Sequence, residues 1–195
     1  MERFHEIGRG KIAAIATSLE MRQRPPLRPA PEALMGEIVP WTQPDADTYL
    51  ALYRKVGGAH LWFSRLYMSQ AELDAVLQNP ATAIFSWRVA GEDEGLLELD
   101  FSEPESCEIK YFGVSESQQG TGAARALMNH AIETAFARPV QRLWLHTNTI
   151  DHPRALAFYQ RSGFVPIGQS LEIADDPRLN GALPRDAAPH VPIFD

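Results

Sequence analysis

The chain has 195 residues, about the length of one globular domain. Apolar residues make up 45% and charged residues 22%, as is usual for a globular protein in water. No apolar run approaches the roughly 18 residues that a membrane-spanning helix needs. The first residues, Met1–Ile7, lack the pattern of a secretory signal, so we expect a cytoplasmic protein.

The charge and the cysteine count exclude several classes of function. A net charge of −7 argues against binding to the phosphate backbone of nucleic acids, so we expect neither a nucleic-acid nor a membrane partner. Cys107 is the single cysteine, which excludes an internal disulfide and a cysteine-based zinc cluster. The six histidines are scattered without metal-ligand spacing, so we expect no metal site.

The secondary structure is predicted from apolar periodicity and from capping and turn residues. In chain order, the expected elements are a strand (Ile12–Met21), a strand (Glu37–Trp41), a helix (Asp45–Val56), a helix opened by a capping box at Ser69 and ending near Leu77, a strand (Ala83–Val89), a strand (Leu96–Phe101), a strand (Glu108–Val114), a helix (Thr121–Phe136), a strand (Val140–His146), a helix (Pro153–Arg161) and a strand (Phe164–Gln169). A turn over Gly91–Gly95 makes a hairpin of the strands around it, and Asp151 is the expected N-cap of the last helix. The order predicts a mixed α/β sheet with helices packed on it.

Two proline-rich segments flank this body. Arg24–Pro31 is expected to be extended, because proline fixes φ and lacks a backbone donor. The tail Asp176–Asp195 is either disordered or pinned to the domain by apolar residues, namely Leu179, Leu183, Val191 and Ile193. We therefore divide the chain into residues 1–35 (strand and connector packed on the domain), 36–172 (main domain) and 173–195 (extended tail).

A glycine-containing turn between the strand that ends at Val114 and the helix that starts at Thr121 carries the strongest functional signal. Gly120 and Gly122 let the backbone approach a ligand closely. The first turn of a helix adds unpaired N–H groups and a partial positive charge. Together these features predict an anion site suited to a phosphate or pyrophosphate. A tight strand-to-helix connection without a ligand is the alternative.

Two common nucleotide sites do not fit this turn. A P-loop requires a lysine after its glycines, and none follows here. The dinucleotide fingerprint needs a small residue where Arg125 stands, and an acidic residue on the next strand, which carries none. A nicotinamide-dependent oxidoreductase is therefore disfavoured.

The turn, with its neighbours, resembles a known superfamily. Gln119–Ala124 fits the pattern Gln/Arg-x-x-Gly-x-Gly/Ala, the acyl-CoA pyrophosphate loop of the GNAT superfamily of N-acetyltransferases. The preceding strand, Glu108–Val114, is similar to the strand before that loop, and Ala155–Phe164 is similar to the Ala-x-x-(apolar)-Tyr-x-x-x-Gly-Phe signature. The resemblance is strong over Leu97–Gly168 and weaker from Glu37. Further features resemble a bacterial subgroup without a settled substrate.

The resemblance implies a fold and an activity. It implies an α/β (α+β type) domain over residues 36–172, whose mixed, mostly antiparallel sheet has splayed central strands and flanking helices. The implied activity is direct transfer of the acetyl group of acetyl-CoA, as a cosubstrate, to a primary amine of a small molecule or peptide, without a metal. A non-catalytic acyl-CoA-binding or sensory module is the alternative. A homodimer is also left open.

The resemblance also assigns the residues that hold acetyl-CoA. Main-chain groups of Phe112, Gly113 and Val114 would pair with the pantetheine. Backbone N–H groups of the loop would hold the pyrophosphate, from Gln119, Gly120, Thr121, Gly122, Ala123 and Ala124. Arg125 is either a phosphate ligand or an exposed helix arginine. Many relatives place an asparagine where this chain has His152, so the nearby Asn148 becomes the candidate for that pantetheine contact.

Two residues are candidates for proton transfer. The attacking amine must be neutral, yet an amine with a pKa near ~10.4 is mostly protonated at pH 7. Glu108 is the candidate base, because it stands at the spacing that one branch of the superfamily uses; Glu98, Asp100 or bound water are alternatives. Tyr159 matches the tyrosine that protonates the departing thiolate in many relatives, and a packed core tyrosine is the other interpretation.

Substrate selection is expected from the first half of the chain. Trp62 and nearby aromatic residues would enclose a small amine, and Arg65 would clamp a carboxylate. The alternative is that these residues only form core. His146, near a strand end, is a candidate substrate ligand and second base. Cys107 points away from Glu108, because side chains alternate along a strand, so we expect a buried and unreactive thiol.

Overall fold

A computed structural model describes residues 4–195. The first three residues of the segment inspected for a signal sequence lie outside the described part. Of the helices described, none is long and apolar enough to cross a membrane. The cytoplasmic location stays a prediction.

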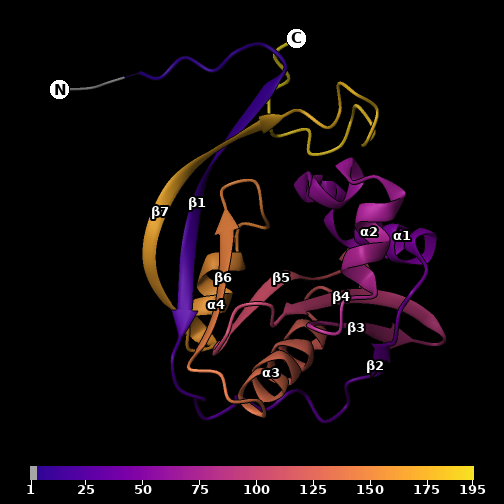
Figure 1. Ribbon diagram of the computed structural model, residues 1–195, viewed down its shortest axis with the longest axis vertical. Helices are drawn as coiled ribbons and strands as arrows, with labels where there is room; N and C mark the ends of the chain where they lie inside the picture. The colour runs from indigo at the N-terminus through magenta and orange to yellow at the C-terminus, as the bar shows by residue number, and fades with distance from the viewer. Residues whose placement is uncertain (1–3) are drawn as a thin grey trace.

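Within residues 4–195, seven strands form one sheet, accompanied by four α-helices and three short 3-10 helices (Figure 1). In chain order they are β1 (Lys11–Met21), β2 (Glu37–Trp41), α1 (Ala46–Gly57), η1 (Gly58–His60), η2 (Ser64–Tyr67), α2 (Gln70–Leu77), β3 (Thr82–Val89), β4 (Glu92–Asp100), β5 (Ser106–Val114), η3 (Glu116–Gln118), α3 (Ala123–Phe136), β6 (Arg142–Asn148), α4 (Ala155–Arg161) and β7 (Val165–Asp175).

The strand order is β2-β3-β4-β5-β6-β1-β7. Every neighbouring pair is antiparallel except β5 and β6, which run parallel. The predicted mixed, mostly antiparallel sheet is therefore confirmed. The first strand of the chain, β1, lies inside the sheet between β6 and β7 (Figure 1).

Helices cover the sheet on both faces, because side chains alternate between the faces of a strand. On one face, the apolar stripe of α3 packs against Leu97 and Leu99 of β4. On the other face, α1 and α2 pack against Leu96 of β4 and Ile84 of β3. Neighbouring residues of β4 thus serve two separate cores.

Several local predictions hold, and two fail. Ser69 and Glu72 form the expected capping box. The turn expected over Gly91–Gly95 is wrong: Ala90 (φ 51°) and Gly91 (φ 89°) make a two-residue turn, and β4 begins at Glu92. The prediction of Asp151 as a helix N-cap is also wrong, because α4 is preceded by Arg154 without a side-chain cap.

The last strand is longer than expected. β7 continues to Asp175, six residues beyond the predicted end, because it pairs with β1 along its whole length. β7 is an edge strand, and its apolar residues Val165, Ile167, Leu171 and Ile173 are 49–61% exposed.

The proline-rich connector and the tail both lie on the domain. The connector lies against α3, and the Asn129 side chain of this helix donates a hydrogen bond to the Arg28 carbonyl (2.8 Å). Of the two alternatives for the tail, disorder or attachment to the domain through apolar residues, the structure shows the second. Leu183 packs into a small core with Leu61, and the buried guanidinium of Arg178 pairs with Asp176 at 2.7 Å.

Candidate active site

The candidate site begins where β5 and β6 separate. The two strands pair only over Ser106–Glu108 and Arg142–Trp144, although they continue to Val114 and Asn148. Beyond these three pairs the strands diverge into a wedge, as the splayed strands of the expected fold require. The facing edges of both strands therefore carry backbone groups without a partner across the wedge.

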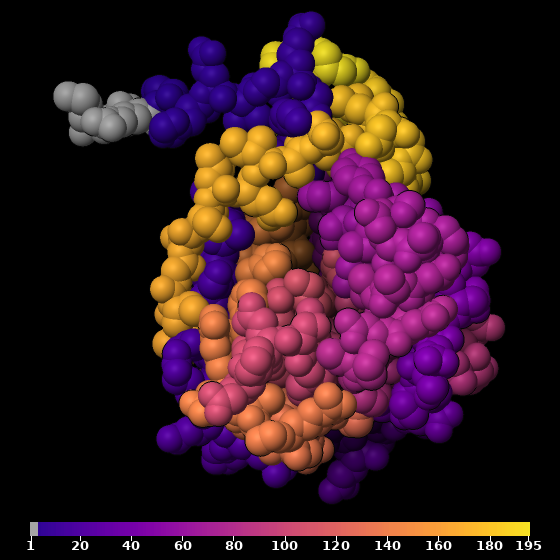
Figure 2. All heavy atoms as spheres, in the orientation of Figure 1, coloured from indigo at the N-terminus to yellow at the C-terminus, as the bar shows by residue number. Residues whose placement is uncertain are grey.

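A cavity of about 620 Å³ occupies this wedge and is lined by residues from both sides of the sheet. One end is lined by Gln119, Gly120 and Ala124 at the start of α3, and the other by Trp62 and Phe63 after α1. In space-filling view, the surface is hollowed between the segments drawn in orange and the helices drawn in magenta (Figure 2). The cavity joins the two halves of the site that the sequence suggested separately.

The glycine turn presents free backbone at one end of the cavity. Gly120 has φ +79°, and a Cβ there would meet no atom within 4 Å, so the backbone faces open space. Gly122 has φ +105°, and a Cβ there would lie 2.5 Å from Pro31 of the connector. The first turn of α3 has no capping side chain at its N-cap. The Ala123 N–H donates to the Thr121 hydroxyl (3.2 Å), so the N–H groups available to an anion are those of Ala124 and Arg125.

Tyr159 packs in the core and also lines the cavity. Its ring packs against Phe112, Phe158 and Phe164 at 5.7–6.1 Å between centroids. It also lines the cavity, and its hydroxyl has no hydrogen-bond partner among the described residues. Burial, and secondarily the Asp151 carboxylate, raises the pKa of Tyr159 above its usual value. The phenol is therefore a protonated donor at neutral pH.

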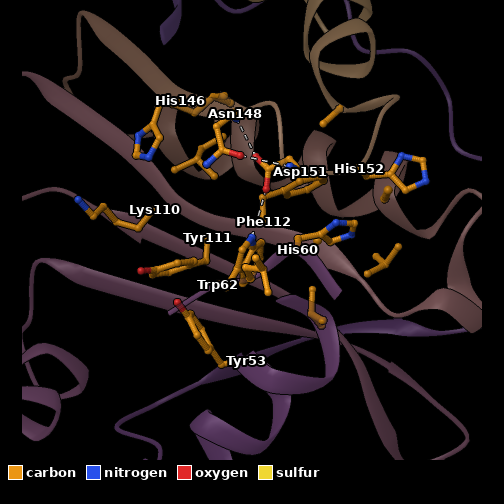
Figure 3. A pocket seen from close by; sticks show the side chains of 18 of the residues that line it. Tyr53, His60, Trp62, Lys110, Tyr111, Phe112, His146, Asn148, Asp151 and His152 are labelled. Carbon is orange, nitrogen blue, oxygen red and sulfur yellow. Dashed lines mark hydrogen bonds between the residues drawn. The ribbon is translucent and has the colours of Figure 1, made fainter. Parts of the chain in front are cut away.

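The aromatic residues of the first half form the opposite wall. Trp62, Tyr53 and Tyr111 pack together with ring centroids 4.9–5.5 Å apart. The indole of Trp62 rests on glycine backbone, since a Cβ at Gly57 would lie 2.1 Å from it. Its Nε1 donates to Asp151 across the wedge at 3.4 Å (Figure 3).

Arg65 lines this wall, but its charge already has a partner. The guanidinium pairs with Glu98, and both side chains are buried, at 7% and 1% exposed. Glu98 also accepts a hydrogen bond from the Tyr49 hydroxyl. This geometry favours a structural ion pair over a free clamp for a substrate carboxylate, and it removes Glu98 from the cavity.

Glu108 lies beside the cavity, and His146 lies in its wall. The Glu108 carboxylate accepts a hydrogen bond from Lys110 at 3.0 Å and is 3.9 Å from His146 Nδ1. His146 is about half exposed and lies in the cavity wall just beyond the last β5–β6 pair, where the wedge begins (Figure 3). Neither Glu108 nor its rivals Glu98 and Asp100 line the cavity.

Asn148 organises the end of the cavity nearest β7. Its side-chain amide donates to Glu172 (3.0 Å), and its backbone N–H donates to Asp151 (3.0 Å). Thr147 donates a second hydrogen bond to the same Asp151 oxygen at 2.7 Å. Sequence analysis missed Asp151 and Glu172 as site residues. The alternation of apolar and polar residues in Leu171-Glu172-Ile173 is typical of a strand. It could have extended the predicted strand past Gln169 and placed Glu172 in it.

The predicted site residues as a whole divide into two groups. Those that line the cavity are Trp62, Arg65, Phe112, Gly113, Val114, Gln119, Gly120, Ala124, His146, Asn148 and Tyr159. Those that do not are Glu108, Thr121, Gly122, Ala123 and Arg125.

Cys107 is fully buried, and burial raises the pKa of its thiol to about 12. No group of three His, Cys, Asp or Glu side chains among residues 4–195 is arranged to hold a metal ion.

Residues 20–164 match the sequence profile of the Acetyltransferase (GNAT) family. The chain belongs to this family. The match includes the wedge, the glycine turn and Tyr159, and it confirms the resemblance on which the sequence analysis relied. The GNAT domain begins within β1 and ends just before β7.

Relatives with curated names are also acetyltransferases. An uncharacterized N-acetyltransferase of Mycobacterium tuberculosis is 32% identical over 97 residues, covering 50% of this chain and 62% of that protein. Spermidine N(1)-acetyltransferase of Vibrio cholerae is 28% identical over 125 residues, covering 57% and 68%. Mycothiol acetyltransferase of Beutenbergia cavernae is 34% identical over 85 residues, covering 42% of this chain and 28% of that protein. The matched part of this GNAT protein thus spans between about a quarter and two thirds of these relatives.

Solved structures support the fold alone. A GCN5-related N-acetyltransferase from Sphaerobacter thermophilus superposes with a TM-score of 0.61 at 16% identity, covering 84% of this chain and 52% of that one.

Proposed function

We propose that this GNAT protein transfers the acetyl group of acetyl-CoA to a primary amine of a small molecule or peptide. The observation that carries the proposal is the single cavity that connects the glycine turn, through the β5–β6 wedge, to the aromatic wall around Trp62. An acyl donor held at one end and an amine entering from the other would meet inside the wedge.

The residues at one end of the cavity fit acetyl-CoA, which supplies an activated thioester when bound. The open backbone at Gly120 and the N–H groups of Ala124 and Arg125 in the first turn of α3 suit its pyrophosphate. The unpaired edge of β5 over Phe112–Val114 offers backbone groups to the amide-containing pantetheine. Arg125 lies near Arg28 and Arg161, and burial together with their charges lowers the pKa of Arg125. A bound phosphate group would offset the repulsion among these three positive charges.

We assign the first proton transfer to His146, with Glu108 as a positioning residue behind it. Deprotonating a primary amine at pH 7 costs roughly 4–5 kcal/mol, so a group in the cavity wall must accept the proton. His146 lines the cavity, and Glu108 lies 3.9 Å from its Nδ1. The original candidate, Glu108, would thus act through its neighbour. His146→Gln should lower kcat more than Glu108→Gln does, and the reverse order would return the base to Glu108.

Tyr159 would complete the transfer. The amine nitrogen forms a bond to the acyl carbon, the carbon–sulfur bond breaks, and the sulfur leaves as a thiolate. Tyr159 lines the cavity and its hydroxyl has no hydrogen-bond partner among residues 4–195, so it can give that thiolate a proton. The ammonium proton taken by His146 leaves to solvent, and the second proton, which the nitrogen loses once it is bonded to the acyl carbon, replaces the one given up by the phenol.

Acetyl-CoA binding is the test of this proposal. We would titrate the protein with acetyl-CoA by calorimetry, with NAD and ATP as controls, and then screen amines by thiol release. Selective binding of acetyl-CoA followed by amine-dependent thiol release supports the transferase. Tight binding without release from any amine would select the non-catalytic acyl-CoA module instead. Absence of binding would contradict both.

A further inference from the structure

We propose that the end of the cavity nearest β7 is a cation subsite, so that the preferred acceptor is a primary amine carrying a second positive charge. Asp151 and Glu172 supply the negative charge of this subsite, and Phe63 supplies an aromatic wall. The inference rests on the proposed acetyl transfer, and it names the class of acceptor as diamines or polyamines rather than amino acids.

The charges in the cavity wall are unequally compensated. Arg65 and Lys110 line the cavity, but each is paired with a carboxylate outside it, Glu98 and Glu108. The carboxylates of Asp151 and Glu172 line the cavity, and neither forms an ion pair with a described residue. Uncompensated negative charge in a partly enclosed space favours a cationic ligand.

Four other basic groups line the wall: His146, which the proposed mechanism uses as the base, Arg154, His152 and His60. Arg154 is exposed at the N-cap of α4, a helix whose Ala155 and Phe158 pack in the same core as α3. Nδ1 of His152 accepts a hydrogen bond from the Arg154 N–H at 3.1 Å. Burial, aided by the nearby His152 and His190, lowers the pKa of His60 and keeps it neutral at pH 7, although Asp151 opposes the shift.

Asn148 donates hydrogen bonds to both carboxylates. Asn148 donates through its side chain to one oxygen of Glu172 and through its backbone to Asp151. Its own side-chain oxygen accepts from the N–H groups of Ile150 (2.9 Å) and Asp151 (3.2 Å), which sets the orientation of the amide. The second oxygen of Glu172 has no partner among the described residues and remains free to accept from a ligand.

Glu172 reaches this position because its neighbour is small. It lies on β7 directly opposite Ala14 of β1, and side chains at opposite positions share one face of the sheet. The methyl group of Ala14 leaves room for the longer carboxylate to cross β1 toward Asn148 at the end of β6.

The surroundings of Glu172 suit an ammonium group. Phe63, Leu61 and Ala174 line the same small space as Glu172, next to the main cavity. An aromatic ring attracts a cation over its face, and apolar walls strengthen the attraction of a carboxylate for that cation. The reacting amine would lie in the wedge while its second ammonium rests between Glu172 and Phe63.

The test compares three acceptors of similar length: 1,4-diaminobutane, 1-aminobutane and 4-aminobutanoate. We expect kcat/KM for the diamine to exceed that for the monoamine about tenfold or more, mainly through KM, since a charged hydrogen bond is worth that much. The aminobutanoate should be the poorest of the three. In Glu172→Gln, whose carbonyl still accepts from Asn148, the ratio of diamine to monoamine should fall close to one.

A matched control comes from the same strand. Asp175 lies on β7, pairs with Lys11 and does not line the cavity. Asp175→Asn removes the same charge from the protein and should keep the wild-type ratio. A wild-type ratio near one, or a high ratio that Glu172→Gln leaves unchanged, would overturn the cation subsite while acetyl transfer stands.

The inference also has a readout that does not need turnover. Calorimetric titration of the protein saturated with CoA should show tighter binding of the diamine than of the monoamine, with the difference lost in Glu172→Gln. If acetyl-CoA binds but no amine releases thiol, the transferase proposal fails and this titration still decides the subsite. Equal binding of the two amines in that titration would overturn it.

Discussion

Glu98 allows a structural role and a catalytic role to be separated by one substitution. From the sequence, Glu98 is an alternative candidate for the base that deprotonates the amine. In the structure, its side chain is buried and contacts Arg65 and Tyr49. Glu98→Gln preserves the shape and an acceptor for Tyr49, but it leaves the Arg65 charge buried without a counter-ion. Removing one partner of a buried ion pair costs about 3–5 kcal/mol. We expect the free energy of unfolding to fall by that amount.

The measurement is urea unfolding followed by the fluorescence of the four tryptophans. Domains are stable by only about 5–15 kcal/mol, so the predicted loss moves the midpoint far more than the error of the method. A second variant, Glu98→Gln with Arg65→Met, removes both charges and should recover most of the loss, because apolar replacements of buried pairs are often neutral. The double-mutant cycle gives the coupling between the two side chains.

A surface pair provides the control for the same chemical change. Glu133 pairs with Arg24, and both are about half exposed, so Glu133→Gln should cost less than about 1 kcal/mol. A loss this small in Glu98→Gln would refute the buried pair. A Glu98→Gln protein of wild-type stability whose kcat falls about a hundredfold would instead make Glu98 the base, at the usual contribution of such a group.

Four further predictions concern Tyr159, Cys107, His60 and the exposed strand β7. Tyr159→Phe should keep acetyl-CoA affinity while kcat falls about a hundredfold, the usual contribution of a general acid, and an unchanged kcat would refute that role. The Cys107 thiol, with its pKa raised to about 12, should not react with a disulfide reagent at pH 8 until urea is added; prompt labelling of the folded protein would contradict its burial. The pKa of His60 is lower in the folded state, so the unfolded state binds more protons as pH falls through the ordinary histidine value, and the urea midpoint should drop between pH 7.5 and 5.5. His60→Gln should reduce that drop, and an equal drop in both proteins would contradict the assignment. A second copy laid antiparallel on the edge of β7 would bury its exposed apolar side chains. Light scattering should therefore detect a dimer that Leu171→Asp dissociates, and a wild-type monomer would reject the homodimer.

The order and type of the elements could be predicted because their signals are local. The capping box at Ser69 and the apolar stripe of α3 are contained within a few turns of chain. The failed turn over Gly91–Gly95 shows the limit of such signals. Its acidic residues are typical of a loop. In the structure, however, Asp93 accepts hydrogen bonds from Ser86 and Arg88 on the facing strand, and these bonds stabilise the segment as part of β4. Only the pairing partner reveals this.

The candidate site divides in the same way. The glycine turn and Tyr159 are found from short patterns, whereas Glu172 and Asn148 are 24 residues apart and meet only through the sheet. The choice of Glu108 relied on spacing along a regular strand. β5 has an irregularity at Lys110, where Tyr111 and Ile109 oppose the consecutive residues Glu98 and Leu99. Such a bulge reverses which side chains share a face, so spacing across it does not locate a base.

Because β1 lies inside the sheet, the segment 1–35 contributes a strand to the fold of the main domain. β1 is hydrogen-bonded to β6 on one edge and to β7 on the other, and it is the only neighbour of β7 in the described sheet. Asn148 on β6 and Glu172 on β7 are held within hydrogen-bonding distance across this strand. Without residues 11–21, β7 would have no backbone partner and Glu172 would have no fixed position relative to the wedge. The first strand therefore helps to position the end of the cavity nearest β7 as much as the residues that line it.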